Sequence, residues 1–304
     1  MKRAAVVGVA AGVTAIVIAA GATGWLLTRP SGPDAAARGF LEALAADDAE
    51  AAVALLADEP ESRTDLVAAY DGATSMVVDP RVIGTESESG GRSRAEVSFT
   101  LDGDVVTTSF GLVETRDGWR IAADGLGAVT PTVTIGDAVA TGSALLPAGT
   151  ESDLLPGAYA LAAAPVRFLD GETTATVLPG GSEQPEVEAS VDPAATEAAQ
   201  DQFDAYLEEC AAPATAVPDN CGLRVPWAVD LTSLDRIAFR IDERPVLALS
   251  EDGASFDATG GVIVATATGT ARGGGTASFT YRADDWALRG SVRFTGDDLV
   301  LVVR

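Results

Sequence analysis

The sequence contains no histidine, and its only lysine is Lys2. Without histidine, Ser-His-Asp and Cys-His catalytic arrangements and histidine-ligated metals are excluded. Without a lysine beyond position 2, the Ser-x-x-Lys and Lys-Thr-Gly motifs of penicillin-binding proteins and β-lactamases are excluded from the rest of the chain. Asp, Glu, Tyr and Arg remain available for acid–base chemistry. No pattern singles out any of them, so we predict no catalytic residue.

Cofactor and metal motifs are also missing. No GxGxxG follows a strand and opens a helix, and there is no GxxxxGK[ST] phosphate loop. Two cysteines without a CxxC pair are too few for a zinc site. No Asp/Asn spacing matches a calcium loop, and Asp102-Gly103-Asp104 and Asp297-Asp298 fit turns better. We therefore predict no cofactor and no metal.

Positive charge is scarce. The chain has 20 Lys and Arg against 45 Asp and Glu, for a net charge of −25. Such a surface repels nucleic acid, which is not an expected partner. Abundant Ala and Gly, with Arg in place of Lys, are typical of high-GC actinobacteria, so lineage explains the composition better than a calcium function does.

A long uncharged segment covers residues 4–27. Its 24 residues reach roughly 36 Å as a helix, which is enough to cross a hydrocarbon core of ~30 Å. We predict a transmembrane helix there, with residues 1–3 as a cytoplasmic tip and residues 28–33 as a linker. Lys2 and Arg3 precede the span and only Arg29 follows closely, which favours a cytoplasmic N-terminus. The expected location is the cell membrane, with a single pass and an extracellular body.

A cleaved signal peptide is the alternative interpretation. Ala20-Gly21-Ala22 offers a small-x-small cleavage site behind a short basic start. The apolar run, however, exceeds the roughly 7–15 residues usual for the hydrophobic region of a signal peptide, and it continues beyond that site through Trp25-Leu26-Leu27. We favour the uncleaved anchor, so that residues 4–27 hold the protein on the membrane. Both interpretations export the body.

Cys210 and Cys221 are the only cysteines. With ten residues between them and an exported location, the simplest prediction is a disulfide that closes a small loop. The alternative is two unpaired small core residues. Because α-helical spacing connects Phe203, Tyr206 and Leu207 to Cys210, the disulfide would tie the end of a helix to the following segment.

Residues 34–128 begin with helical periodicity and end with strand periodicity. Asp34 is the expected N-cap of a first helix, and two shorter helices follow, the last over residues 63–70. The period then changes to two, and Asp102-Gly103 and Asp117-Gly118 mark hairpin turns between strands. Helices followed by an antiparallel meander are typical of an α+β domain. Tyr70 and Trp119 are predicted to pack in its core.

Two stretches of this domain carry a resemblance: FLEALAADDAEAAVALLAD, residues 40–58, and VSFTLDGDVVTTSFGLVETRDGWRIA, residues 97–122. They resemble the cystatin-like cone of the nuclear-transport-factor-2-like superfamily, most of all the exported modules of Gram-positive membrane proteins. The resemblance covers about a third of the chain. It implies a curved sheet wrapped over helices. The superfamily includes ketosteroid isomerases and many non-enzymatic binding modules, and no catalytic motif of it matches this sequence.

The rest of the body divides into two parts. Short apolar runs separated by Pro and Gly predict a small all-β module over residues 129–182, followed by a linker at 183–192. Residues 193–304 predict a second α+β domain: a helix that begins at Asp192-Pro193, a short helix over Ala228–Leu234, and seven antiparallel strands. Gly260-Gly261 is an expected turn, and Asp284-Asp285 is expected to precede a strand.

Two classes of function compete on these observations. The first is a non-catalytic binding or scaffold protein, anchored in a Gram-positive (actinobacterial) cell envelope, with another envelope protein as its partner. The alternative is an exported acid–base enzyme, of isomerase or lyase type, that uses a pocket inside the cone. A deep pocket with an unpaired carboxyl or phenol at its floor would favour the enzyme, whereas an interior filled by apolar side chains would favour binding at an outer surface.

Overall fold

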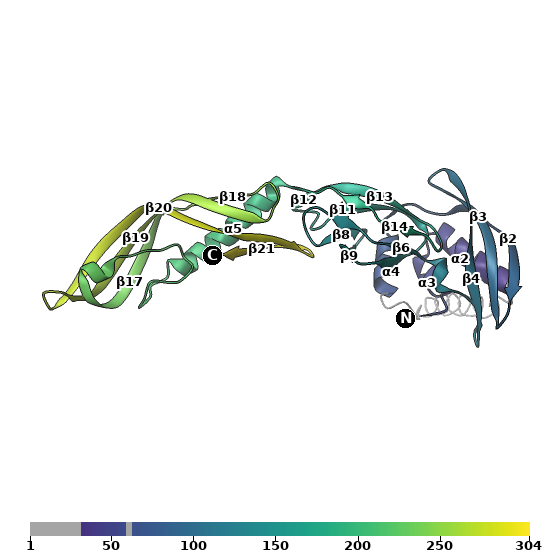
Figure 1. Cartoon of the computed structure of the whole chain (residues 1–304), viewed down its shortest axis with the longest axis horizontal. Coiled ribbons are helices and arrows are strands. Elements are labelled where there is room, and N and C mark those ends of the chain that lie inside the picture. The colour runs from purple at the N-terminus through teal and green to yellow at the C-terminus, as the bar shows by residue number, and fades with distance from the viewer. Residues whose placement is uncertain (1–31, 59–62) are drawn as a thin grey trace, which may run out of the picture.

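The computed structural model describes residues 32–58 and 63–304, which form an elongated molecule with two lobes (Figure 1). Both lobes combine helices with mostly antiparallel strands, as the predicted α+β class requires. The predicted tip and membrane span, residues 1–3 and 4–27, lie outside the described residues. Within the described part of the chain, no helix has the length and apolar character needed to cross a bilayer.

Three helices open the first lobe: α2 (Pro33–Ala45), α3 (Ala49–Val53) and α4 (Arg63–Tyr70). The prediction that Asp34 caps the first helix is wrong. Pro33 already occupies the first turn, because its fixed φ suits that position, and Gly32 is the N-cap without a side-chain bond. Asp34 instead forms an ion pair with Arg38 at 2.8 Å. Asp48 caps α3 by accepting a hydrogen bond from the N–H of Ala51 at 2.9 Å.

A four-stranded antiparallel sheet follows in sequence order: β2 (Val78–Glu88), β3 (Arg92–Leu101), β4 (Asp104–Thr115) and β5 (Gly118–Ile121). The predicted turns at Asp102-Gly103 and Asp117-Gly118 are confirmed, and Asp102, Gly103 and Gly118 adopt the positive φ that such turns need. The sheet packs on α2, where the rings of Phe40 and Phe110 meet edge to face with centroids 5.7 Å apart.

Residues 127–191 add many short strands to the same lobe. Strand β1 (Ala73–Ser75) pairs with β11 (Gly157–Ala163), so residues 34–128 and 129–182 share a five-stranded sheet in the order β1-β11-β8-β9, with β13 also on β11. The remaining strands are β6 (Gly127–Val129), β7 (Thr132–Val133), β8 (Ala138–Thr141), β9 (Ala144–Pro147), β10 (Ser152–Leu154), β12 (Leu169–Asp170), β13 (Glu172–Val177), β14 (Ser182–Glu183), β15 (Glu186–Val187) and β16 (Ser190–Val191).

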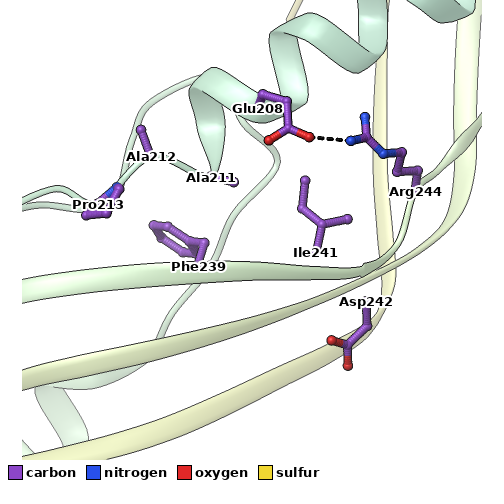
Figure 2. Close-up of a pocket in the computed structure, with 8 residues that line it drawn as sticks. All are labelled: Glu208, Ala211, Ala212, Pro213, Phe239, Ile241, Asp242 and Arg244. Atoms are coloured by element: carbon purple, nitrogen blue, oxygen red, sulfur yellow. Dashed lines mark hydrogen bonds and ion pairs between the residues drawn. The ribbon is translucent and has the colours of Figure 1, made fainter.

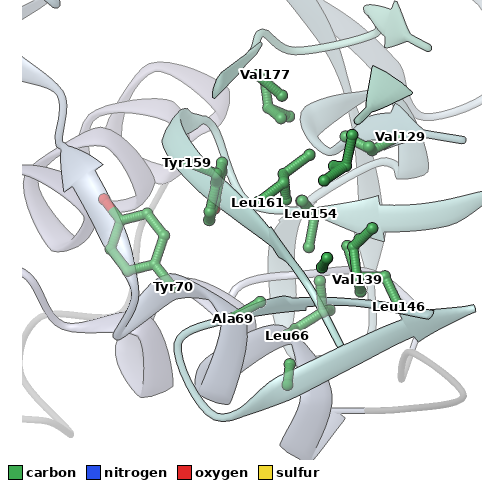
Figure 3. Close-up of a cluster of buried hydrophobic side chains, with 14 of the residues drawn as sticks. Leu66, Ala69, Tyr70, Val129, Val139, Leu146, Leu154, Tyr159, Leu161 and Val177 are labelled. Atoms are coloured by element: carbon green, nitrogen blue, oxygen red, sulfur yellow. The ribbon is translucent and has the colours of Figure 1, made fainter. Parts of the chain in front are cut away.

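The helices and this second sheet also share one hydrophobic core (Figure 3). Tyr70 of α4 lies next to Tyr159 of β11, with ring centroids 6.5 Å apart. The Tyr70 hydroxyl donates to the carbonyl of Leu44 at 2.8 Å, and the Tyr159 hydroxyl donates to that of Leu155 at 2.6 Å. Both phenols are therefore buried with their polar ends satisfied, which confirms the core role predicted for Tyr70.

The second lobe places helix α5 (Pro193–Cys210) on one face of a five-stranded sheet. The helix begins as predicted: Asp192 accepts a hydrogen bond from the N–H of Ala194 at 2.7 Å, and Pro193 occupies the first turn. The strand order is β17-β19-β20-β21, with β18 on β19. Their bounds are β17 (Leu231–Glu243), β18 (Val246–Leu249), β19 (Ser255–Ala271), β20 (Thr276–Thr295) and β21 (Asp298–Val303).

Three local predictions for this lobe are wrong. Gly260-Gly261 and Asp284-Asp285 do not separate strands, because β19 and β20 run through them as single strands of 17 and 20 residues. The pairing register shifts at these positions, so the residues form bulges instead of turns. The helix expected over Ala228–Leu234 is a single turn of 3₁₀-helix, Trp227–Val229, after which buried Leu231 pairs with Ala271 and starts β17.

The two lobes meet at the ends of β20 and β21. Phe294 of β20 packs close to Gly253, which also lies near Ile135 of the first lobe. Arg167 donates to the carbonyl of Asp297 at 2.9 Å and to the carboxylate of Asp298 at 3.0 Å. An apolar contact and charged hydrogen bonds therefore join the lobes.

Candidate functional site

Packed side chains fill the interior of the first lobe. Its largest fully buried residues are aromatic or aliphatic, and they include Phe40, Phe99, Phe110, Leu112 and Ile121. The two buried tyrosines use their hydroxyls on backbone carbonyls, as described above. The principal hollows of the molecule lie instead on outer surfaces, and the two with aromatic walls lie together in the second lobe.

These two hollows flank the segment that follows α5, residues 211–230, which we call the disulfide arm. Cys210 and Cys221 form the predicted disulfide, with an S–S distance of 2.03 Å and a Cα–Cα distance of 5.7 Å. The indole N–H of Trp286 donates to the carbonyl of Cys221 at 2.9 Å. Ala214 exchanges two backbone hydrogen bonds with Ile237 of β17. The arm contains little regular secondary structure besides the 3₁₀ turn Trp227–Val229. The disulfide and these hydrogen bonds therefore hold it on the sheet.

A small second core lies between the arm and the distal part of β17, β19 and β20. Four residues of the sheet are fully buried there: Leu231, Ile237, Ala265 and Ala267. The arm covers them with partly buried apolar side chains from Ala214, Val217, Val225 and Trp227. Burial of this apolar surface, added to the disulfide, keeps the arm in one position.

The first hollow, which we call the β20 groove, lies between the arm and β20 and has a volume of about 370 Å³. Its floor is apolar and consists of Phe239, Ile263 and Ala265. Leu223, Val225 and Pro226 of the arm form one wall, and residues 281–283 and 285–287 of β20 form the other. Neighbouring residues of a strand point to opposite faces of the sheet. Because consecutive residues of β20 line the groove, the groove must follow the edge of that strand.

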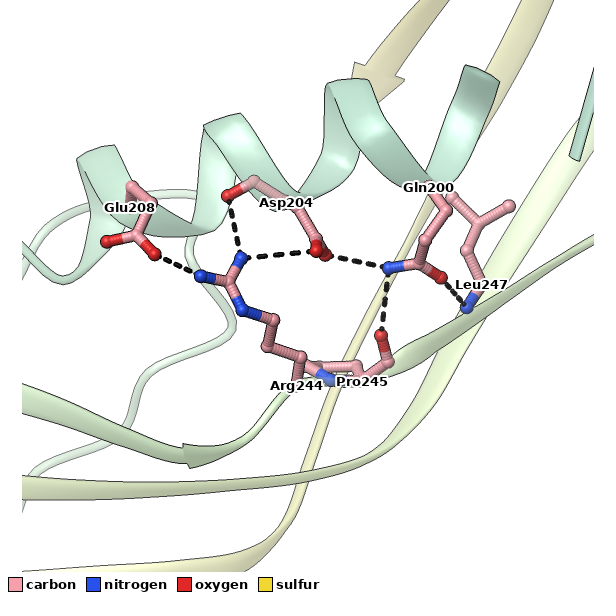
Figure 4. A network of polar contacts seen from close by, with 6 residues as sticks. All are labelled: Gln200, Asp204, Glu208, Arg244, Pro245 and Leu247. Carbon is pink, nitrogen blue, oxygen red and sulfur yellow. Dashed lines mark hydrogen bonds and ion pairs between the residues drawn. The ribbon is translucent and has the colours of Figure 1, made fainter. Parts of the chain in front are cut away.

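The second hollow lies on the other side of Phe239, at the C-terminal end of α5, and measures about 660 Å³ (Figure 2). An ion pair between Glu208 of α5 and Arg244 lies at its rim. Arg244 also contacts Asp204 at 3.2 Å, and Gln200 binds the carbonyl of Pro245 and the N–H of Leu247 (Figure 4). This network ties α5 to the turn between β17 and β18, so it serves the structure of the lobe.

Two titratable groups of the second lobe have shifted pKa values: Asp242, which lies at the second hollow, and Tyr281, which lines the β20 groove. Hydrogen bonds from Arg240 and Arg282, at 2.8 and 2.6 Å, lower the pKa of the Asp242 carboxyl. Removal from water, together with the hydrogen bond that the Tyr281 hydroxyl donates to Asp230 at 2.7 Å, raises the pKa of Tyr281 to about 12. A paired carboxylate and a neutral phenol suit binding better than proton transfer.

The same direction of shift holds for every tyrosine: loss of hydration on folding is the first cause that raises the pKa of Tyr70, Tyr159, Tyr206 and Tyr281. The unfolded chain therefore loses phenolic protons at lower pH than the folded chain does. The contribution of the protonated tyrosines to the free energy of unfolding is fully present below about pH 10, the pKa of an unfolded tyrosine. It is lost as the pH rises through the pKa values of the tyrosines in the folded protein, which is about 12 for Tyr281.

We expect the folded protein to show less phenolate absorbance at 295 nm than the unfolded chain at roughly pH 10.5, where an unfolded tyrosine is more than half ionised. Adding urea at that pH should raise the absorbance together with the loss of circular dichroism. Half-ionisation of the tyrosines near pH 10 in a protein that is still folded would contradict these pKa directions.

Charge is distributed unevenly between the lobes. Residues 34–192 carry 28 Asp and Glu against 8 Arg, whereas residues 193–304 carry 17 against 9. Arg224, Arg282 and Asp285 are among the residues that line the β20 groove. The groove therefore lies in the less acidic lobe, with an apolar floor and a rim of mixed charge.

Sequence reasoning identified the disulfide but not the groove. The groove exists only because the arm leaves the β20 side of the sheet face around Phe239 and Ile263 uncovered. The Pro-rich composition of the arm was the available signal, since such a segment does not cover a sheet face as a regular helix would. Trp119, predicted as core, is half-buried and packs against the core of the first lobe.

Comparison of the chain with family models, with characterised proteins and with solved structures finds no match. The resemblance of residues 34–128 to a nuclear-transport-factor-2-like cone stays a prediction. Among residues 32–58 and 63–304, no group of three or more Cys, Asp or Glu side chains gathers in a way that would hold a metal ion.

Proposed function

We propose that this chain is a membrane-anchored, extracytoplasmic protein of a Gram-positive (actinobacterial) cell envelope with a non-catalytic binding or scaffold role. In this proposal, residues 4–27 cross the membrane once, the N-terminus is cytoplasmic and the two lobes are outside the cell. The β20 groove is the surface that binds another envelope protein.

The observation that carries this proposal is where the hollows lie. The interior of the first lobe is filled by aromatic and aliphatic side chains, whereas the β20 groove is open to solvent over an apolar floor. This arrangement favours a binding module over an acid–base enzyme with a pocket inside the cone. The disulfide supports an oxidising location, because such bonds persist mainly outside the cytosol.

Protease treatment of intact cells tests the topology. With an epitope tag after Arg304, we expect an added protease to remove the tag from the full-length protein while a cytoplasmic marker stays whole. Survival of the tag on intact cells, followed by its loss after lysis, would place the body inside and overturn the proposal.

Groove-blocking variants test the binding role. Ala283→Phe places a ring in the β20 groove, and Ala54→Phe makes the same change at an exposed position of the first lobe. We expect the full-length protein, cross-linked and purified from native membranes, to retain a partner that Ala283→Phe reduces by at least about tenfold, equivalent to about 1.4 kcal/mol. Ala54→Phe should leave recovery unchanged. Equal recovery with both variants, each with unaltered thermal stability, would exclude the groove as the binding surface.

A further inference from the structure

Strand β20 has an open edge over its first residues. It pairs with β19 on one side, and β21 pairs with it on the other side only from Gly290 to Thr295. At the hairpin, the N–H of Ala271 donates to the carbonyl of Gly275, so these two residues form a hydrogen-bonded pair from which the pattern along the strands can be counted. Because hydrogen-bonded and non-bonded pairs alternate in antiparallel sheets, residues 277, 279, 281 and 283 direct their backbone groups to β19. Those of Thr276, Ser278, Thr280 and Arg282 face away from it.

The contact between Thr268 and Ser278 agrees with this assignment. Their hydroxyl oxygens are 2.7 Å apart, as expected in a non-hydrogen-bonded pair, where side chains approach most closely. Within the described part of the chain, no other hydrogen bond reaches the outward backbone groups of the four residues. Four N–H and C=O pairs are therefore available to another strand.

Each of the other edges of this sheet makes at least one hydrogen bond with another segment of the chain. Ala214 of the disulfide arm bonds the outward backbone groups of Ile237 on β17. Gln200 of α5 binds the N–H of Leu247 on β18, and Gln202 binds the carbonyl of Leu299 on β21. The open stretch of β20 also contains no proline or lysine, which commonly protect such edges. It therefore presents four alternate residues whose outward backbone groups have no hydrogen-bond partner in the described part of the chain.

We infer that two copies of this chain pair through this edge, antiparallel and about a twofold axis at Thr280. In that register Thr280 meets Thr280 of the other copy, and Ser278 of each copy lies opposite Arg282. On the inner face, Phe279 of each copy lies opposite Tyr281 of the other, and aromatic cross-strand pairs stabilise sheets. Outward-facing backbone groups meet each other throughout, as antiparallel pairing requires.

Charge excludes one alternative register and permits the association. A shift of the axis to Arg282 would place two arginines opposite each other, which is destabilising. The axis at Thr280 places no like charges in register. The acidic first lobe lies at the opposite end of the elongated molecule from the open edge (Figure 1). Repulsion between the two acidic lobes is then screened, since charges interact over only about 8 Å at physiological salt.

The pairing also affects the β20 groove. Residues 281–283 line both the groove and the paired edge. In the proposed dimer, Ala277 of the second copy lies opposite Ala283, so that the neighbouring strand forms part of the groove mouth. The dimer does not depend on the proposed envelope partner, because it follows from the open edge alone.

Cysteine cross-linking in native membranes tests the twofold axis on the full-length protein. Thr280→Cys places identical residues opposite each other at a Cα separation of about 5.5 Å, within the range for a disulfide. Thr266→Cys is the matched control, since Thr266 is an exposed threonine next to Thr280 on the same face but one strand from the edge. We expect mild oxidation to convert most of the Thr280→Cys chain to a dimer on non-reducing gels, and Thr266→Cys to remain monomeric.

Thr280→Pro provides a second measurement. It removes an outward N–H that β19 does not use, and proline is tolerated at such positions of edge strands. We expect the unsubstituted protein in detergent to sediment as a dimer at high concentration and Thr280→Pro to sediment as a monomer with an unchanged circular dichroism spectrum. Equal cross-linking of the two cysteine variants, or a monomer at every concentration of the unsubstituted chain, would overturn the inference. Cross-linking of Thr280→Cys in a chain that also carries Ala283→Phe separates the two proposals: loss of partner recovery with cross-linking retained assigns that loss to the groove and not to the dimer.

Discussion

Replacing Gly72 with alanine is expected to destabilise the first lobe by about 3 kcal/mol, at the upper end of the usual cost of overpacking. A methyl group at Gly72 would lie 2.1 Å from the backbone nitrogen of Gly142 and 2.4 Å from its Cα. Backbone atoms cannot rotate away as the end of a side chain can. Gly142 in turn has a φ of +56° and approaches the carbonyl of Ala68, so the contact is tight from both sides.

This contact joins the end of α4 to the turn between β8 and β9, and therefore joins residues 34–128 to residues 129–182. Hydrogen exchange measured by mass spectrometry should show peptides from α4 and from β11 losing protection together in Gly72→Ala. Gly84→Ala is the matched control, because no atom lies within 4 Å of its added methyl group. If α4 loses protection while β11 keeps it, the two segments unfold separately and the shared core is not cooperative.

Removing the disulfide with Cys210→Ala and Cys221→Ala together is expected to destabilise the second lobe by about 3 kcal/mol. The bond closes a short loop, and on the chain-entropy model a loop of roughly 12 residues restricts the unfolded chain by that amount. The effect should concentrate in the disulfide arm, since the sheet keeps its own strand pairing. Exchange protection of residues 211–230 should fall further than that of β19.

The same double variant has a consequence for binding. Leu223, Val225 and Pro226 form the arm side of the β20 groove, and Cys221 fixes the start of that wall through the hydrogen bond from Trp286. We expect partner recovery from membranes to fall as it does with Ala283→Phe. Unchanged protection of the arm after removal of the bond would show that the small apolar core under Trp227 is sufficient to hold it.

Local signals allowed much of the fold to be predicted. Asp-Gly pairs at hairpin turns located the meander of β2 to β5, and Asp192-Pro193 located the start of α5. The spacing of Cys210 and Cys221, together with the predicted export of the chain, was sufficient to predict their bond. Each of these features depends on residues that are close in sequence, so periodicity and turn chemistry describe them well.

The features that were missed depend on distant residues. The pairing of Ala73 with Tyr159 joins short segments 86 positions apart, and a three-residue strand has no period to recognise. Gly260-Gly261 has the composition of a turn, but the neighbouring strands continue past it and absorb the extra residue as a bulge. The β20 groove was not predictable because it also depends on residues that are distant in sequence. It exists only where the irregular disulfide arm lies against β20.

Strand β20 has a mechanical consequence. It extends from the tip hairpin to Phe294 at the junction with the first lobe, and 20 residues at about 3.4 Å each make a rod of roughly 65 Å. A ladder of hydrogen bonds to β19 resists bending on either side of the bulges at residues 258–263 and 283–288. A force applied to the hairpin at the tip is therefore transmitted along β20 to the contacts between the lobes. The residues around Phe294 and Arg167 carry most of that force.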